Sequence, residues 1–325
     1  MVTEIIWLVV GLGLLTWGAE WLVRGGSKLA RAIGVSPLAI GLTIVAFGTS
    51  APEMVVNIKS VSTGSFDIAL GNVVGSNIFN VLFILGICAM ILPLTVASKL
   101  VKMDVPIMVA ASVLLYTFCL DHSLSRFEGM VFLALIVLYT VVCFRVSKTE
   151  SSEVKNEFDQ EFGGDIKLLK TPQQLAINTL LIVLGLVLLV VGAKFLVSSA
   201  IAIARQFGVS ELVIALTIVA AGTSLPEVAT SIMATIKGER DIAIGNVVGS
   251  NIFNILSILG VSSVMSSGGM PINPVSMAVD IPFMIFIALI CYPIFRSQST
   301  ISRMEGGLFF ALYVGYTVYL IKFAN

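Results

Sequence analysis

Ten apolar segments, each about twenty residues long or longer, restrict what this sequence can fold into. A helix of about 20 apolar residues crosses the ~30 Å hydrocarbon core of a bilayer. Only 12% of the residues are charged, whereas soluble domains carry roughly 25%, and the short alternating segments of a transmembrane β-barrel are absent. We therefore expect an all-α polytopic membrane protein with ten transmembrane helices, over 4–23, 37–62, 68–92, 104–120, 127–146, 175–205, 211–236, 241–265, 277–295 and 304–323.

Charge and cysteine content argue against several other classes of protein. The formal net charge is zero, so the chain lacks the basic footprint of a nucleic-acid-binding protein. The four cysteines lie in or beside apolar segments without metal-ligand spacing, which is typical of small buried hydrophobic residues. No nucleophile is arranged with a base, so the chain is not expected to be an enzyme. Neither a cofactor nor a protein partner is implied.

The two halves of the chain carry the same sequence. An offset of 174 residues aligns 11–86 with 185–260 without a gap, and 34 of 53 positions from residue 34 onward are identical. Each half contains five spans, and a unit with an odd number of spans enters the bilayer the second time in the opposite orientation. We therefore predict two inverted-topology five-helix repeats, over 1–146 and 175–325, joined by a linker at 147–174.

Lysine and arginine predict the orientation of the chain. If the N-terminus is extracytoplasmic, fourteen of the 19 basic residues fall in cytoplasmic loops, as the positive-inside rule requires. Both termini are therefore expected outside a cell (cytoplasmic or inner) membrane. The linker mixes lysines with six acidic residues, Gly163-Gly164 and Pro172, and is expected to be flexible and cytoplasmic.

Two glutamates lie well inside apolar segments. Glu53 ends GLTIVAFGTSAPE and Glu227 ends IALTIVAAGTSLPE, although an acidic residue at the centre of a span costs about 2.5–3.5 kcal/mol. A permanent ion pair is not a general compensation, because Lys59 follows Glu53 whereas the matching position 233 is Met. The sequence therefore favours a bound cation as the neutralising charge.

A proline next to each glutamate predicts a broken helix. Pro52 removes a backbone donor and pushes against the carbonyl of Gly48, and Pro226 does the same to Gly222. Carbonyl oxygens freed in this way can coordinate a cation, as in the broken helices of transporters. Thr49 and Thr223 lie four residues before Glu53 and Glu227, and so on the same helix faces.

The segment GNVVGSNIFN occurs unchanged at 71–80 and 245–254. Its polar residues form one helical stripe in each half: Asn72, Ser76 and Asn80, and Asn246, Ser250 and Asn254. We call the span that carries Glu53 or Glu227 the glutamate helix of its half, and the span that carries this ten-residue motif the amide helix. The GxxxG glycines of the motif predict that the glutamate helix and the amide helix of each half pack closely. Asn77 and Asn251 lie off the stripe, where packing or local hydrogen bonding is the expected role.

These residues form an all-oxygen set of candidate ligands: Glu53, Glu227, Asn80, Asn254 and the carbonyls of Thr49 and Thr223. Such a set can supply the 6–8 oxygens that Ca2+ prefers, whereas Mg2+ keeps its waters and needs a rigid octahedron. The absence of Cys and His disfavours zinc, copper and iron. Two negative charges are neutralised by one Ca2+ or by two Na+, which is a physical basis for exchange.

GTSAPE and GTSLPE, each followed 27 residues after the Glu by the last Asn of GSNIFN, resemble the two α-repeats of the cation/calcium exchanger superfamily. The motifs cover about 41–86 and 215–260, and the prokaryotic sodium/calcium exchangers are the most similar branch. The resemblance implies ten helices, a site surrounded by the broken helices, and first and sixth spans that slide past it. It implies Glu53 and Glu227 as central ligands completed by Asn80 and Asn254, and flanking sodium sites from Thr49, Thr223, Ser50, Ser224, Ser76, Ser250 and the carbonyls of Ala46 and Ala220.

The expected function is Na+/Ca2+ antiport by alternating access, with two alternatives. Many sodium/calcium exchangers carry Asp where this chain has Asn80 or Asn254, which leaves the number of sodium ions open. The first alternative is a proton-coupled Ca2+/cation antiporter, but that branch typically places acidic residues on both pairs of helices. The second alternative is a cation channel that uses the same oxygens.

Overall fold

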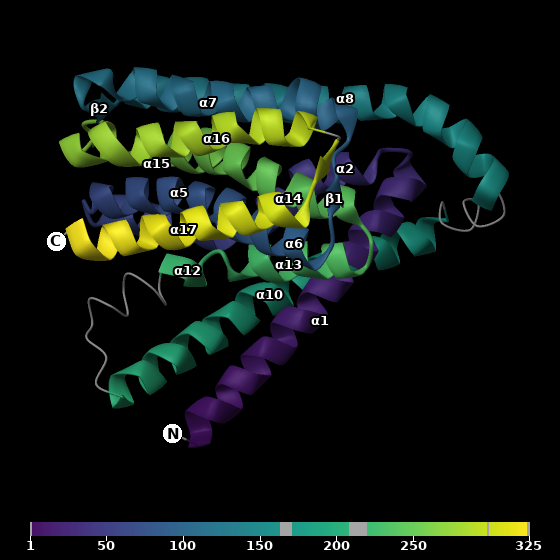
Figure 1. Cartoon of the computed structure of the whole chain (residues 1–325), viewed down its shortest axis with the longest axis horizontal. Helices are drawn as coiled ribbons and strands as arrows, with labels where there is room; N and C mark the ends of the chain where they lie inside the picture. The colour runs from purple at the N-terminus through teal and green to yellow at the C-terminus, as the bar shows by residue number, and fades with distance from the viewer. Residues whose placement is uncertain (1, 163–170, 208–219, 298, 324–325) are drawn as a thin grey trace.

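The computed structural model describes residues 2–162, 171–207, 220–297 and 299–323, which are mostly helical (Figure 1). The first half contains α1 (Val2–Ile33), α2 (Pro37–Ile40), η1 (Gly41–Val45), α3 (Ala46–Thr49), α4 (Ala51–Ser62), α5 (Phe66–Phe79), η2 (Asn80–Leu85), α6 (Gly86–Ile91), β1 (Leu94–Thr95), η3 (Leu100–Asp104), α7 (Val105–Phe118), η4 (Cys119–Asp121), β2 (Ser123–Leu124) and α8 (Arg126–Phe162). The second half contains α10 (Pro172–Gln206), α12 (Ala220–Gly222), α13 (Leu225–Ile236), α14 (Arg240–Phe253), η6 (Asn254–Leu259), α15 (Gly260–Met265), β3 (Met270–Pro271), η7 (Ser276–Asp280), α16 (Ile281–Arg296), β4 (Thr300–Ile301) and α17 (Arg303–Phe323).

The helices account for the predicted spans. Within the described ranges, seven helices are long and apolar enough to cross a bilayer, and an eighth span is a pair bent by 44° between Thr49 and Ala51. Helix α17 covers the predicted tenth span. The later part of the predicted span 211–236 forms α12 and α13, and its first part, up to 219, lies outside the described residues.

The amide helices form the centre of the bundle. In the most apolar 18-residue stretch of Arg240–Met265 every residue is buried, and in the same kind of stretch of Phe66–Ile91 72% of the residues are buried. The corresponding values for α1 and α10 are 22% and 28%, so this pair lies at the periphery, where it runs diagonally to the other helices (Figure 1). The position follows from composition, because Asn and Ser side chains within a span are stabilised by facing protein rather than lipid.

Two short antiparallel ribbons connect the repeats. Strand β1 pairs with β4 through Leu94 and Ile301, and β2 pairs with β3 through Leu124 and Met270. Each ribbon joins a loop of one repeat to a loop of the other, and the two ribbons lie at opposite ends of the bundle (Figure 1). This is the arrangement that an inverted duplication requires, since equivalent loops of the two repeats then lie at opposite ends.

Glycines hold α1 and α10 together. A Cβ on Gly18 would lie 2.8 Å from the Gly185 carbonyl, and one on Gly11 would lie 2.8 Å from the Gly192 carbonyl. The reverse also holds for Gly185 and Gly192, so the backbones of the two helices touch at points seven residues apart. Small residues at such a seam allow the close van der Waals packing that drives helix association in membranes.

In the second half, the GxxxG glycines do not pack on the glutamate helix of their own repeat, so the predicted packing partner is wrong. Gly245 and Gly249 lie against Leu38 and Leu42, in the first part of the broken helix of the other repeat. A Cβ on Gly249 would lie 2.6 Å from the Leu42 carbonyl, so only Gly fits this approach. The bend at Ser50 explains the difference, because it directs the first part of the broken helix to α14 and leaves α4 to pack on α5.

The segment between the repeats is more helical than expected. Helix α8 continues to Phe162, and α10 begins at Pro172 with Thr171 as its N-cap. The start of the predicted flexible linker therefore prolongs a span, because extending an existing helix through Glu and Lys residues is favourable once the helix is nucleated. The division into repeats and linker remains a prediction.

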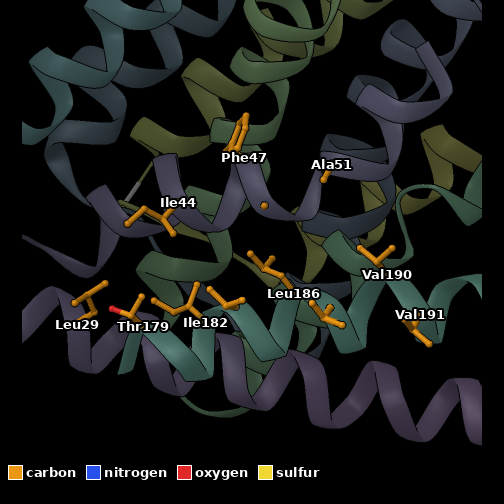
Figure 2. A pocket seen from close by; sticks show the side chains of 12 residues that line it. Leu29, Ile44, Phe47, Ala51, Thr179, Ile182, Leu186, Val190 and Val191 are labelled. Carbon is orange, nitrogen blue, oxygen red and sulfur yellow. The ribbon is translucent and has the colours of Figure 1, made fainter. Parts of the chain in front are cut away.

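An apolar cavity of about 610 Å³ separates α10 from the broken helix of the first repeat (Figure 2). Ile44, Phe47 and Ala51 line it on one side, and Leu186 and Val190 on the other. None of the candidate ion ligands lines it, so it is not the ion site. Beside the cavity, α10 contacts the broken helix through apolar side chains, such as Leu186 against Gly48.

We predict that Gly18→Val lowers the thermal unfolding midpoint of the purified protein, because the new side chain would overlap the α10 backbone at a cost of about 1–3 kcal/mol. Gly13→Val is the matched control, since a Cβ there meets nothing within 4 Å. Thermal unfolding in detergent measures both. Equal unfolding midpoints for the two variants would contradict the claim that close packing at these glycines holds α1 and α10 together.

Candidate ion-binding site

Glu53 and Glu227 are brought together at the centre of the bundle. Both are 1% exposed, and each accepts a hydrogen bond from the serine that lies three residues before the other glutamate. Lys59, the basic residue nearest to Glu53 in sequence, is exposed. The structure therefore places two acidic side chains in a buried site, as the sequence predicts.

The breaks in the helices position these carboxylates. Helix α3 ends at Thr49, Ser50 takes φ −81° and ψ 9°, and α4 starts at Ala51. Ser224 takes φ −87° and ψ 9° before α13. Each glutamate thus stands in the first turn of a new helix, where the positive end of the helix dipole stabilises a carboxylate.

Each glutamate is held by a serine of the other repeat. The Ser50 hydroxyl donates to Glu227 Oε1 at 2.9 Å, and the Ser224 hydroxyl donates to Glu53 Oε1 at 2.8 Å. Ser224 also lies 3.2 Å from the Ser76 hydroxyl. The two repeats are therefore interlocked at the site itself.

Several buried oxygens on the helices that carry the two glutamates and the two ten-residue motifs lack a hydrogen-bond partner. Buried polar atoms in proteins normally have one, so a group of them at one place indicates a ligand that supplies the missing interaction. In the part of the chain that the structure describes, these atoms include Glu53 Oε2, Glu227 Oε2, Asn80 Oδ1, Asn254 Oδ1, Thr223 Oγ1 and Ser250 Oγ.

Asn80 and Asn254 begin the π-helical turns η2 and η6. Such turns often occur at functional sites, and here they interrupt the regular helix at the last Asn of each ten-residue motif. The amide nitrogens of Asn80 and Asn254 donate to the side-chain oxygens of Asn251 and Asn77, at 3.1 and 3.0 Å. Their own oxygens remain without a partner among the described atoms.

Sequence reasoning missed two supporting residues. Asn57 Oδ1 accepts a hydrogen bond from Asn72 Nδ2 at 2.7 Å, and Ser231 Oγ accepts one from Asn246 Nδ2 at 3.0 Å. These bonds tie each amide helix to the glutamate helix of its own half. The available signal was a polar residue four positions after each glutamate, on the same helix face.

The other predicted ligands lie as follows. Thr49 is buried and donates to Asn246 Oδ1 at 3.0 Å. Ala46 is buried, and its carbonyl accepts the Ser50 N–H at 3.0 Å. Ala220 is the first residue of α12, and its side chain is outside the described part of the chain.

The donor set is hard and carries two acidic groups. Within the described ranges, no three His, Cys, Asp or Glu residues form a group that could hold a metal. Amide, hydroxyl and carboxylate oxygens with only two acidic side chains suit alkali and alkaline-earth cations rather than transition metals. The chemistry of the donors therefore fits a site for such cations.

Comparison with known proteins gives the family. A family model described as sodium/calcium exchanger protein matches residues 3–145 and 177–322. Inner membrane protein YrbG of Escherichia coli (strain K12) is 36% identical over 87% of this chain and 86% of its own length. Sodium/calcium exchanger MaX1 of Methanosarcina acetivorans is 33% identical over 96% of this chain and 97% of its own. The structure of the sodium-calcium exchanger NCX_Mj soaked with Na+ and Ca2+ has a TM-score of 0.83 at 29% identity and covers 99% of both chains.

The structural match over the whole length confirms the predicted fold, an all-helical membrane protein with ten transmembrane helices in two inverted five-helix repeats. It also confirms that the chain is a multi-pass membrane transporter rather than an enzyme. The chain belongs to the sodium/calcium exchanger family, within the cation/calcium exchanger superfamily.

Proposed function

We propose that this protein is a secondary active antiporter that exchanges Na+ for Ca2+ at a midplane site formed by Glu53, Glu227, Asn80 and Asn254. One observation carries the proposal. Both glutamates and both asparagines are 1% exposed, and each retains an oxygen without a partner among the described atoms. A cation that binds between them supplies the missing interactions.

Charge balance supports exchange between these two ions. The site carries two acidic side chains, and burial of an unneutralised charge costs several kcal/mol. One Ca2+ or two Na+ neutralise the pair equally. A protein that changes conformation only when its site is neutral therefore alternates between the two loads, which is the requirement for coupled antiport.

The donor chemistry supports Ca2+ as the divalent cargo. Two carboxylates supply up to four oxygens, and the amides of Asn80 and Asn254 supply two more. With the Thr49 and Thr223 carbonyls this reaches the 6–8 ligands of Ca2+. The flanking hydroxyls of Thr49, Thr223, Ser50, Ser224, Ser76 and Ser250, with the carbonyls of Ala46 and Ala220, are the proposed additional contacts for Na+.

We assign sodium rather than protons as the coupling ion. Asn at both 80 and 254 leaves the amide helices without an acidic group at the site. The relative MaX1 is named a sodium/calcium exchanger. Proton coupling is the competing assignment, because two buried carboxylates can also be neutralised by protons.

Alternating access is proposed to arise from movement of the α1–α10 pair. The glycine seam joins these two helices, whereas their contact with the broken helix includes the apolar cavity beside Phe47 and Leu186 (Figure 2). Leu186 lies against Gly48 and Val197 against Gly222, so α10 covers the breaks of both glutamate helices. Sliding along hydrocarbon surfaces breaks no hydrogen bonds there.

The proposed location is a cell membrane with both termini extracytoplasmic. The excess of Lys and Arg in loops on the side opposite the termini supports this orientation. YrbG, one of the relatives, is named an inner membrane protein.

Replacement of either glutamate should abolish calcium transport. We expect Glu53→Gln and Glu227→Gln each to lower Ca2+ affinity by more than about 100-fold, since a unit charge at 4 Å contributes ~4 kcal/mol at an effective dielectric constant of 20. Uptake of ⁴⁵Ca²⁺ by proteoliposomes measures this. Glu128→Gln is the control, because Glu128 caps a helix through Ser125 away from the site. Normal uptake by either site variant would refute the site.

The identity of the coupling ion is tested by comparing Ca2+ uptake driven by a Na+ gradient with uptake driven by a proton gradient. Proteoliposomes loaded with Na+ and diluted into Na+-free buffer with Ca2+ should accumulate Ca2+, and vesicles loaded with K+ at the same pH should not. An imposed proton gradient without Na+ is the third arm. Uptake driven by protons alone would replace sodium coupling with proton coupling.

Asn254→Asp should change sodium dependence more than calcium affinity. The new carboxylate adds a third acidic group, which an additional Na+ can neutralise. We expect a higher Hill coefficient for Na+ in Na+-dependent Ca2+ efflux, with the Ca2+ half-saturation changed less. An unchanged sodium cooperativity would count against the role given to the neutral amide.

A further inference from the structure

We infer that Asn77 and Asn251 are positioning residues that aim the amide oxygens of Asn254 and Asn80 at the cation, through side-chain hydrogen bonds that cross between the repeats. The inference rests on the proposed ion site. Asn77 and Asn251 are 2% and 3% exposed, at the point where the two amide helices meet.

The orientation of these two side-chain amides is fixed by hydrogen bonds to backbone carbonyls. Asn77 Nδ2 donates to the carbonyl of Asn251 at 3.3 Å, and Asn251 Nδ2 donates to the carbonyl of Asn77 at 3.2 Å. A carbonyl oxygen only accepts, so the nitrogen side of each amide must face it. The same nitrogens contact the sulfurs of Met284 and Met108, which are also acceptors.

The fixed amides in turn orient the proposed ligands. Asn77 Oδ1 is the acceptor for Asn254 Nδ2 at 3.0 Å, and Asn251 Oδ1 is the acceptor for Asn80 Nδ2 at 3.1 Å. Since an amide oxygen cannot donate, Asn254 and Asn80 must turn their nitrogens toward it. Their own oxygens then point the other way, and both are buried without a hydrogen-bond partner among the described atoms.

The consequence for binding follows from the polarity of an amide. A flipped Asn254 would present N–H groups, with their positive partial charge, where the cation requires an oxygen. The terminal torsion of Asn has two roughly equivalent orientations, so the side chain alone does not select one. Asn77 selects it.

A double-mutant cycle tests the inference in the full-length exchanger. Calcium binding to Asn77→Ala, Asn254→Ala and the double variant in lipid nanodiscs is measured by titration calorimetry. Asn77→Ala should weaken Ca2+ binding about tenfold, the size of one well-placed hydrogen bond. In the Asn254→Ala background the same change should weaken it less than about twofold, since the amide that Asn77 orients is gone.

Two controls separate positioning from general destabilisation. Asn80 donates to Asn251 and not to Asn77, so Asn77→Ala and Asn80→Ala should act multiplicatively. Ser112→Ala removes a buried hydroxyl that bonds within its own helix, and it should leave Ca2+ affinity unchanged. Multiplicative effects in both cycles would overturn the inference, because a purely structural role would not distinguish Asn254 from Asn80.

The outcomes also separate this inference from the function on which it rests. A parent protein that binds no Ca2+ would overturn the proposed function. A parent that binds Ca2+ as tightly as Asn77→Ala would overturn only the positioning role. If Asn77→Ala does not fold, the equivalent cycle between Asn251 and Asn80 replaces it. Failure of both alanine variants to fold would show that these amides hold the bundle together, contrary to the inference.

Discussion

Two buried carboxylates without a permanent cation between them are the constraint on which the rest of this structure depends. Burial of either charge alone costs several kcal/mol. The fold offsets part of that cost with two helix N-termini and with one serine hydroxyl for each glutamate. It leaves one oxygen of each carboxylate without a partner among the described atoms. In the function proposed above, bound cations remove the remaining cost, and the same imbalance then accounts for both the affinity and the requirement that the site be loaded before it moves.

The inverted repeat determines where this imbalance can be placed. A site shared by two copies of one motif lies on the pseudo-twofold axis between them, and here the copies exchange contacts across it. Ser50 holds Glu227 and Ser224 holds Glu53, while the glycines of α14 receive the broken helix of the other repeat. Neither repeat can form the site alone. Equivalent surroundings on both sides of the axis are what the proposed alternating access requires of one set of ligands.

The sequence predicts the broad architecture and the acidic centre, but it does not predict how the amides are arranged. Length and hydropathy define the spans, and the odd number of spans per repeat defines the inversion. Glu53 and Glu227 can be identified from the sequence because an acidic residue inside an apolar span is costly unless its charge is compensated. Asn77 and Asn251 are not, since their contacts cross between helices whose relative rotation no periodicity specifies. The packing partner of Gly245 differs from the prediction for the same reason, because the direction of the chain after the break at Ser50 depends on tertiary packing.

The two repeats are equivalent around the two glutamates and differ where the peripheral helices are anchored. Glu20 of α1 pairs with Lys237 at 2.9 Å, and Glu239 of the same connection also accepts hydrogen bonds from α1. At the matching positions the other copy has Lys194 and Thr63, which cannot form that ion pair. The pair is exposed, so water screens its charges and its contribution to stability is small. The asymmetry between the repeats therefore lies in how α1 is attached to the connection between α13 and α14, whereas the serine–glutamate contacts are exchanged equally between the repeats.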